Sequence, residues 1–449
     1  MTVIESFAAY AARQRASGLP PEATHAAKRA LVDWVSALLP GTRVQPTQAL
    51  QHAHAEELGL GHASLPGLRT TALPATAAWI NGSISHAVEF DDIFRDAVYH
   101  PGCPTIAAAL AVAEQRQLSG ARLLEAITIG YEVSTRIGAA VQPAHYEFFH
   151  TTGTVGCFGA AAAAAVLLSP DAPVTAHALA TSATFASGLQ QAFRSDAMTK
   201  ALHAGHAAWV GVTSAQGAAH GMTGVLDILE GSAGFGAAMA RNPDWSRVTD
   251  GLGERFNIAS VTVKNHGCCG HTFAAIDGLL ALRAQHGFGI DAIRSITVRT
   301  YRTALQVAGI PEPKSAFECK FSLPYVIAHA AKHGSVRLAA FEEDRMREAD
   351  IRGLMRRITL VADEELTARF PGMRAARVEV TLARGEVFEH FQPFRVGDPE
   401  APLSDDQISG KFLELAAPVI GDAAADRLLE ALWTVDRLED VRALRLATL

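Results

Sequence analysis

Ionisable side chains gather in five stretches of the sequence that are otherwise rich in small residues such as glycine, alanine and threonine. These stretches are residues 86–92 together with 100–102, residues 150–156, residues 198–206, residues 264–271 and residues 318–325. A polar ring or an ammonium group gains nothing from packing among small residues, and it needs a partner if it is buried. We therefore take the five stretches as candidates for chemistry.

The first stretch places two carboxylates side by side, at Asp91 and Asp92, with Glu89 just before them and His86 and His100 on either side. Neighbouring like charges disfavour ionisation, so one carboxyl of the pair could hold a proton and either could orient a histidine. The alternative is that both carboxylates cap a helix or face water. The residues alone leave this alternative open.

The second and third stretches are suited to an anionic ligand. His150, Thr151 and Thr152 precede a helical pattern, and the free backbone N–H groups of a helix entry can receive an anion, although ordinary helix caps look the same. Lys200 lies in a region poor in other charges. Its ammonium must therefore be paired or must face a cavity.

Metal binding is not expected. His203 and His206 are three residues apart, but no third ligand has a suggestive spacing. Cys268 and Cys269 are adjacent, and neighbouring residues cannot easily direct two sulfurs at one tetrahedral ion. The five cysteines contain no Cys-x-x-Cys spacing.

The fourth and fifth stretches add further proton-transfer and cationic groups. The fourth runs from Lys264 in a strand-like pattern to His271 at the start of a helical pattern. The dipole of a helix N-terminus lowers the pKa of a histidine and keeps it neutral as a base. The fifth contains Lys320 and Tyr325, and Tyr325 is either a core aromatic residue, which the residues alone favour, or a phenolic acid.

Composition excludes several classes of protein. The chain has 449 residues, of which 49% are hydrophobic, and 39 Lys and Arg against 46 Asp and Glu give a net charge of −7. It can bury a large core, and without a basic stripe nucleic acid is not an expected partner. We find no apolar run near the roughly 18 residues of a membrane span and no signal-peptide pattern. We therefore expect a soluble, cytoplasmic protein with no membrane partner.

Hydrophobic periodicity divides the chain. Helical spacing dominates up to residue 258, including residues 156–168, 174–192, 201–220 and 225–230, while 62–71 reads as a loop. Period-two alternation appears at 260–264, 295–299, 357–361 and 377–382, and the last run continues through Arg384-Gly385 into a strand-like run ending at His390, which predicts a hairpin. Helical patterns at 272–285, 323–333 and 342–355 lie between these strands, and helical spacing resumes at residue 405.

These patterns predict a mainly α protein. One helical domain is built from both chain ends, residues 1–261 and 394–449, and an α+β lid domain of residues 262–393 is inserted in it. No Gly-x-Gly-x-x-Gly follows a strand, so a dinucleotide cofactor is not expected.

The order of the motifs resembles one family. They are His86-x-x-Glu89-Phe90-Asp91-Asp92, His100-Pro101, His150-Thr151-Thr152-x-Thr154, Thr199-Lys200-x-Leu202-His203-x-Gly205, Leu229-Glu230-Gly231, Lys264 followed by Cys268 and His271, and Lys320-Phe321-Ser322-Leu323-x-Tyr325. This order is similar to that of the MmgE/PrpD family, which includes 2-methylcitrate dehydratase, cis-aconitate decarboxylase and iminodisuccinate epimerase. The resemblance extends over nearly the whole chain, to Lys411-Phe412.

The resemblance implies a metal-free, cofactor-free enzyme that is commonly a homodimer and acts on a small polycarboxylate. The catalytic residues it implies are His100, His150, Lys200, His271, Tyr325 and Asp91. We expect Glu89, Asp92, Thr151, Lys264 and Lys320 to bind substrate. Lys200, helped by a protonated histidine or by Arg194, would hold carboxylates, and His271 or His100 would move the proton.

Three reactions fit these residues. We expect first a lyase that dehydrates a hydroxy di- or tricarboxylate in the manner of 2-methylcitrate dehydratase, with Tyr325 or Asp91 protonating the departing hydroxyl. An epimerase of the iminodisuccinate type, a cis-aconitate-type decarboxylase and a binding protein without catalysis are the alternatives. Glu89 and Ile93 depart from the Asp-Phe-Asp-Asp-Thr of decarboxylase-like members, and the stretch from Asp92 to His100 is longer by one residue.

Overall fold

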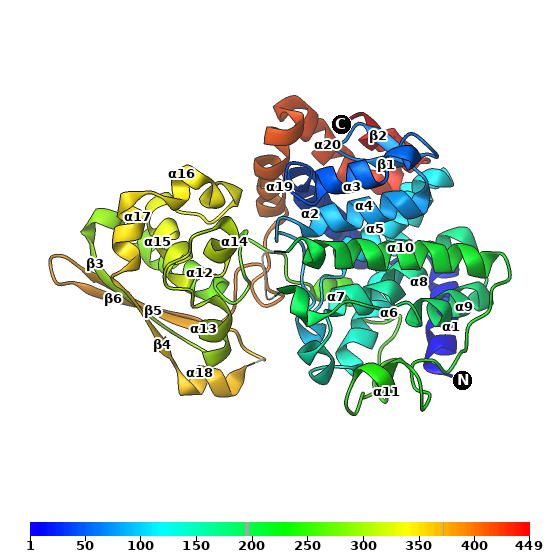
Figure 1. Cartoon of the computed structure of the whole chain (residues 1–449), viewed down its shortest axis with the longest axis horizontal. Coiled ribbons are helices and arrows are strands. Elements are labelled where there is room, and N and C mark those ends of the chain that lie inside the picture. Colours follow the sequence, from blue (N-terminus) through cyan, green and yellow to red (C-terminus); the bar gives the residue numbers. More distant parts are fainter. Residues whose placement is uncertain (194–196, 371) are drawn as a thin grey trace. The chain divides into compact units, whose positions relative to one another are not determined.

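The chain folds into two compact units, each described here by itself. The computed structural model describes residues 1–193, 197–370 and 372–449. Unit 1 consists of Met1–Thr262 and Ser404–Leu449, and unit 2 of Val263–Leu403 (Figure 1). Unit 1 is almost wholly helical and unit 2 combines helices with a sheet, so the predicted mainly α fold class is confirmed.

Unit 1 is built from long helices that pack closely. They are α1 (Val3–Ser17), α2 (Pro21–Gly41), α3 (Thr47–Ala53), α4 (Pro74–His86), α5 (Gly102–Gln115), α6 (Gly120–Ala140), α7 (Thr151–Thr154), α8 (Gly156–Leu168), α9 (Ala172–Ala183), α10 (Thr199–Ala219), α11 (Phe235–Met239), α19 (Asp405–Ile420) and α20 (Asp422–Trp433). Helix α10 packs on both α4 and α8. Where α4 meets α10, a Cβ on Gly82 would lie 3.0 Å from the Cα of Gly205, so the close approach requires glycine.

A buried ion pair joins the two chain segments of unit 1. Lys411 on α19 places its Nζ 2.6 Å from Asp33 Oδ1 on α2, and both side chains are at most 1% exposed. The same ammonium donates to the backbone carbonyl of Phe90, at 3.0 Å. The C-terminal segment thereby holds the loop that follows α4, and this loop carries Glu89, Asp91 and Asp92.

Several local predictions for unit 1 are wrong. The loop expected at 62–71 contains an antiparallel pair, β1 (Ala63–Leu65) with β2 (Thr70–Ala72), whose three-residue strands are too short to show alternation. Residues 225–230 form turns, because glycines flank the run and a Cβ on Gly224 would lie 2.7 Å from that of Ala180. Helix α9 ends at Ala183. Instead of a strand at 260–264, a 3-10 helix at Asn257–Ser260 is followed by a single bridge from Thr262 to Ile93.

Unit 2 contains a four-stranded mixed sheet in the order β4-β3-β5-β6, formed by β3 (Ile293–Thr300), β4 (Ile358–Ala362), β5 (Ala376–Leu382) and β6 (Val387–Gln392). Strand β3 pairs parallel with β4 and antiparallel with β5. These strands confirm the period-two prediction, and β5 and β6 form the expected hairpin with Gly385 at φ 94° in its turn. Alternate residues of β5, such as Val378 and Val380, are fully buried.

Helices cover one face of this sheet (Figure 1). They are α12 (Phe273–His286), which packs on β5 and β6, α15 (Leu323–His333), which packs on α12, and α17 (Ala349–Met355), which packs on α15. The shorter helices are α13 (Arg302–Ala308), α14 (Ala316–Lys320), α16 (Glu343–Met346) and α18 (Glu364–Arg369). The helix expected at 342–355 is therefore broken in two.

Unit 2 extends past the expected lid boundary at residue 393, to Leu403. Arg395 is fully buried and pairs with Asp398 at 2.6 Å. The backbone N–H of Val396 donates to Asp277 Oδ2 at 2.8 Å, and the N–H of Val263 donates to the carbonyl of Gly397 at 2.9 Å. These bonds fasten the segment after β6 to unit 2.

One described stretch is long and apolar enough to span a membrane, contrary to the reading of the sequence. It runs through α7 and α8, from Thr151 to Leu168, and 94% of it is buried inside the fold. Such burial is that of a core helix, because a spanning helix would expose its apolar surface to lipid.

We expect Lys411→Met to lower the free energy of unfolding by about 3–5 kcal/mol, because it leaves the carboxylate of Asp33 buried without its partner. Equilibrium urea unfolding followed by circular dichroism measures this loss. The control is Lys332→Met, which removes a partly exposed lysine from Glu348 and Asp350 and should cost less than about 1 kcal/mol. Equal losses in the two variants would contradict the role given to the buried pair.

Candidate active site

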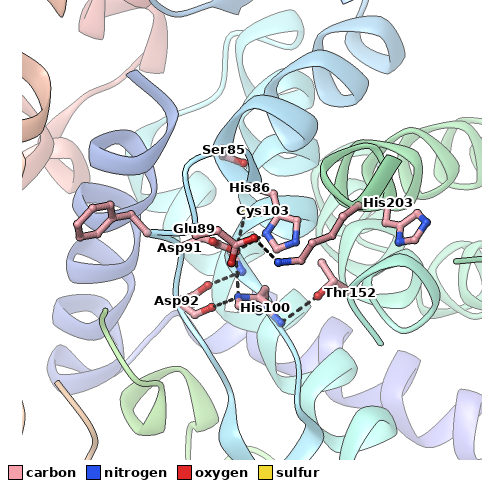
Figure 2. A network of polar contacts seen from close by, with 12 residues as sticks. Ser85, His86, Glu89, Asp91, Asp92, His100, Cys103, Thr152 and His203 are labelled. Atoms are coloured by element: carbon pink, nitrogen blue, oxygen red, sulfur yellow. Dashed lines mark hydrogen bonds and ion pairs between the residues drawn. The ribbon is translucent and has the colours of Figure 1, made fainter. Parts of the chain in front are cut away.

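Unit 1 brings together ionisable side chains from four parts of the chain (Figure 2). His86 is the last residue of α4, and the loop after it carries Glu89, Asp91, Asp92 and His100. His150 precedes α7, and Lys200 and His203 lie in the first turns of α10. Four residues that the sequence analysis proposed as catalytic, Asp91, His100, His150 and Lys200, therefore belong to this one cluster, together with Glu89 and Asp92, which it proposed as binding residues.

Asp91 is 1% exposed and is shared by two histidines. Its Oδ2 lies 2.6 Å from Nδ1 of His86 and 3.0 Å from Nδ1 of His100. The carboxylate accepts, so each ring carries its proton on Nδ1, and the Nδ1–H of His100 also faces the carbonyl of Asp92 at 2.8 Å. The Sγ–H of Cys103 donates to the same Oδ2 at 3.3 Å, and burial holds the pKa of this thiol well above its usual value.

The carboxyl of Asp92 has other hydrogen-bond partners and a raised pKa. Its Oδ2 accepts from the hydroxyl of Tyr131 at 2.8 Å and its Oδ1 from the N–H of Gly102 at 3.0 Å. Burial nevertheless raises the pKa of the Asp92 carboxyl to about 7, with smaller contributions from the charges of Asp33 and Asp91. The Asp92 carboxyl can therefore hold a proton near neutral pH.

Lys200 is paired with a carboxylate. The sequence left two alternatives for its ammonium, a partner or a cavity. Its Nζ donates to Glu89 Oε1, and both side chains are mostly buried, at 18% and 16% exposure. Glu89 has φ 64°, a left-handed backbone conformation that a residue with a Cβ adopts rarely. The loop thus directs this carboxylate to the ammonium at some conformational cost.

His150 contacts a second histidine. Its Nδ1 lies 3.0 Å from Nδ1 of His203, and its ring stacks on that of His86 with centroids 5.5 Å apart. Burial, followed by the charges of His86, Lys200, His203 and His100, holds the pKa of His150 well below its usual value. Thr151 is fully buried, and its hydroxyl accepts from the amide of Gln142 at 3.1 Å.

Unit 2 holds the remaining predicted residues. His271 directly precedes Thr272, the N-cap of α12, and its Nδ1 lies 2.7 Å from the hydroxyl of Tyr301. Its pKa is lowered to about 3, as expected in direction, but burial is the main cause and the guanidinium groups of Arg374 and Arg395 add to it.

Unit 2 also contains three other predicted residues, Tyr325, Lys264 and Lys320. Tyr325 is fully buried, and its hydroxyl donates to the carbonyl of Ala340. Lys264 is 2% exposed, and the ammonium of Lys320 lies 5.5 Å from the ring centroid of Phe341. The catalytic and binding roles of these residues stay predictions. Arg194 lies outside the described residues.

The sequence analysis missed several partners. Tyr131 and Tyr301 bond Asp92 and His271, but each lies about thirty or more residues away from its partner and in an ordinary helix or strand end. Cys103 was not singled out either. His203 was considered as a metal ligand only, although its place three residues after Lys200 on a helix puts the two on neighbouring faces.

One group among the described residues has ligand atoms close enough to hold a metal: His86, Asp91 and Cys103, within 4.8 Å of one another. An ion about 2.0–2.2 Å from a nitrogen and an oxygen in tetrahedral geometry would separate those two atoms by about 3.4 Å. The His86 and Asp91 atoms are 2.6 Å apart. As folded, the group is a hydrogen-bonded network.

We expect Asp92→Asn to remove a pH dependence of stability. Between pH 3.8 and about 7 the folded wild type keeps a proton that the unfolded chain has lost. The stabilisation from this group is thus complete below pH 3.8 and disappears as the pH rises through about 7. Urea unfolding at pH 4.5, 6 and 8 measures it as the difference between wild type and variant. A difference that does not fall with rising pH would contradict the shifted pKa.

Comparisons with known proteins agree with the resemblance seen in the sequence. The MmgE/PrpD N-terminal domain model matches residues 5–248, and the MmgE/PrpD C-terminal domain model matches residues 266–436. The chain is 28% identical to the cis-aconitate decarboxylase-like protein oryM of Aspergillus oryzae, over 95% of this chain and 93% of that protein. It is 26% identical to the human cis-aconitate decarboxylase, over 99% of this chain and 94% of that enzyme. With both domain models matched over most of its length, the chain belongs to the MmgE/PrpD family.

Proposed function

We propose that the protein is a metal-independent lyase that acts at a carbon next to a carboxylate of a small di- or tricarboxylate. The observation that carries this proposal is the cluster of unit 1, where the ammonium of Lys200 accompanies histidines oriented by a buried carboxylate. Lys200, His86 and His100 all act on the pKa of His150, so these groups lie within electrostatic range of one another. Fixed cations and proton carriers are what an enolate-like transition state requires.

Lys200 is proposed to bind a substrate carboxylate. In the free protein Glu89 neutralises its ammonium, and a substrate carboxylate carries the same charge and the same acceptor atoms as Glu89. Replacing one carboxylate by another leaves the ammonium paired throughout. The exchange therefore avoids leaving the Lys200 ammonium as an isolated charge in a largely buried position.

His100 is proposed to transfer the proton. Its Nδ1–H is directed to Asp91 and to the carbonyl of Asp92, and Nε2 is the ring nitrogen proposed to meet the substrate. His86 has the same arrangement but is 1% exposed, and its Nε2 has no hydrogen-bond partner within the described part of the chain. His150, stacked on His86, is the second proton carrier.

Two observations favour decarboxylation as the first reaction to test. The relatives named above are a cis-aconitate decarboxylase and a decarboxylase-like protein. Dehydration, favoured by the sequence, needs an acid for the departing hydroxyl, but Asp91 accepts from two histidines and Tyr325 donates to Ala340. Decarboxylation needs only an acid that protonates carbon after CO2 leaves. Dehydration of a 2-methylcitrate-like substrate is the second candidate.

The test is to incubate the purified protein with cis-aconitate, 2-methylcitrate and iminodisuccinate in deuterated water. We expect CO2 release from cis-aconitate with deuterium in the product. Loss of water with new ultraviolet absorbance would support dehydration, and deuterium wash-in with inverted configuration would support epimerisation. No reaction with any of the three would contradict the proposal and favour a binding protein.

The same assay tests the roles in unit 1. Lys200→Ala should raise KM and lower kcat, because the ammonium acts on ground and transition states alike. His100→Ala should lower kcat by about 10²–10⁴-fold with little change in KM. Lys332→Ala, which removes a partly exposed lysine of unit 2, is the control and should change neither constant.

His271 is tested separately, since it belongs to unit 2. If it transfers a proton, His271→Ala should reduce kcat by about 10²–10⁴-fold and leave the urea unfolding midpoint unchanged. Tyr301→Phe removes only the hydroxyl that meets His271 Nδ1 and should cause a smaller loss of kcat. An unchanged kcat with a lowered unfolding midpoint would show that His271 only stabilises the start of α12.

A further inference from the structure

The contact between His150 and His203 requires one proton shared by two rings. Their Nδ1 atoms lie 3.0 Å apart, within hydrogen-bond distance. A hydrogen bond between two imidazole nitrogens needs one N–H and one lone pair, so one Nδ1 donates and the other accepts. Shifting the proton along this bond exchanges the roles of the two rings.

The surrounding backbone fixes both rings. The N–H of His150 donates to the carbonyl of Gly188 at 2.9 Å. A Cβ on Gly153 would lie 3.1 Å from the Cβ of His203, and a Cβ on Gly188 would lie 3.4 Å from its Nδ1. A side chain at position 153 would press on the Cβ of His203, and one at position 188 would contact its ring. The glycines therefore leave room for His203 to approach His150.

The four neighbouring histidines differ in burial. His86 is 1% exposed and His150 is 2% exposed, whereas His203 and His100 are both partly exposed. Ring centroids are 4.9 Å apart from His100 to His86, 5.5 Å from His86 to His150 and 5.2 Å from His150 to His203. His203 is thus the partly exposed ring that directly contacts the buried His150.

The charged groups near this pair keep both rings neutral at rest. Burial lowers the pKa of His203 to about 4, and the charges of His86, His206 and Lys200 add to this. The pKa of His150 is lowered by burial and by the charges of His86, Lys200, His203 and His100. A proton that arrives on either ring is therefore held weakly and passes on readily.

Decarboxylation requires a path that returns protons from water to the enzyme. The C–C bond to the departing carboxylate breaks, CO2 leaves, and the electron pair that stays on carbon takes a proton from the enzyme. Each turnover therefore consumes one proton, which a buried acid must regain from water. Dehydration and epimerisation consume no net proton.

We propose that His203 is a relay residue that returns protons from solvent to His150 through the hydrogen bond between their Nδ1 atoms. This proposal rests on the lyase function proposed above and deepens it. His203 acts through His150 and is a positioning residue in this sense, not a group that meets substrate.

The test measures CO2 release from cis-aconitate by the full-length protein at constant pH and ionic strength. The assay uses a dilute buffer of large molecules, and imidazole is added at increasing concentrations. In dilute buffer, His203→Ala should lower kcat by about 10²-fold at unchanged KM, because proton return becomes limiting. Imidazole should restore its kcat in a saturable manner and leave the wild type unchanged. A purely structural role would not produce a dependence on buffer.

Two further variants separate a relay from a structural role. In His203→Gln the side chain can still hydrogen-bond to His150 but cannot pass a proton, so kcat should stay low and imidazole should still restore it. His206→Ala, one turn along α10 where the ring packs edge-on against Trp79, is the control and should show no buffer dependence.

The relay is contradicted if His203→Ala keeps its kcat, if its loss of kcat is independent of imidazole, or if His203→Gln restores wild-type turnover. Each of these results leaves the lyase function intact, because the wild type still releases CO2. Failure of the wild type to release CO2 would contradict the proposed decarboxylation, and with it the relay.

Discussion

The arrangement of the active-site cluster depends on one buried carboxylate. Asp91 is 1% exposed, and its Oδ2 accepts hydrogen bonds from two histidines and a thiol. A buried carboxylate needs hydrogen-bond donors, so Oδ2 of Asp91 holds the rings of His86 and His100 in position with their protons on Nδ1. The end of α4, the start of α5 and the loop between them are all constrained by this requirement.

The loop itself is supported from a distant part of the chain. Lys411, from the C-terminal segment, pairs with Asp33 and donates to the carbonyl of Phe90, one residue before Asp91. A buried ammonium with two acceptors gives the loop a fixed point that an exposed ion pair would not provide. The return of the chain to unit 1 after unit 2 therefore has a direct consequence for the cluster. Glu89, which directly precedes Phe90, has a left-handed backbone conformation and pairs with Lys200.

Burial sets the protonation states of the cluster in opposite directions. It raises the pKa of the Asp92 carboxyl to about 7 and lowers that of His203 to about 4, because it disfavours the charged form of both. At neutral pH His150 and His203 are therefore proton acceptors, and Asp92 lies near its titration midpoint. Such protonation states suit the proposed reaction, which develops negative charge on a substrate already carrying carboxylates.

The sequence by itself determined the fold class and the family. The change of hydrophobic period from helical to alternating located β3, β4, β5 and β6, and the ordered motifs indicated the MmgE/PrpD family, because both signals are local or lie in order along the chain. Short elements such as β1 and β2 carry too few residues for a period. Only the tertiary structure decided which groups pair: Glu89 meets Lys200 across 111 positions, His150 meets His203 across 53, and Tyr301 rather than Tyr325 meets His271. Partners of this kind are chosen by packing and burial in the folded chain, and no spacing in the sequence encodes them.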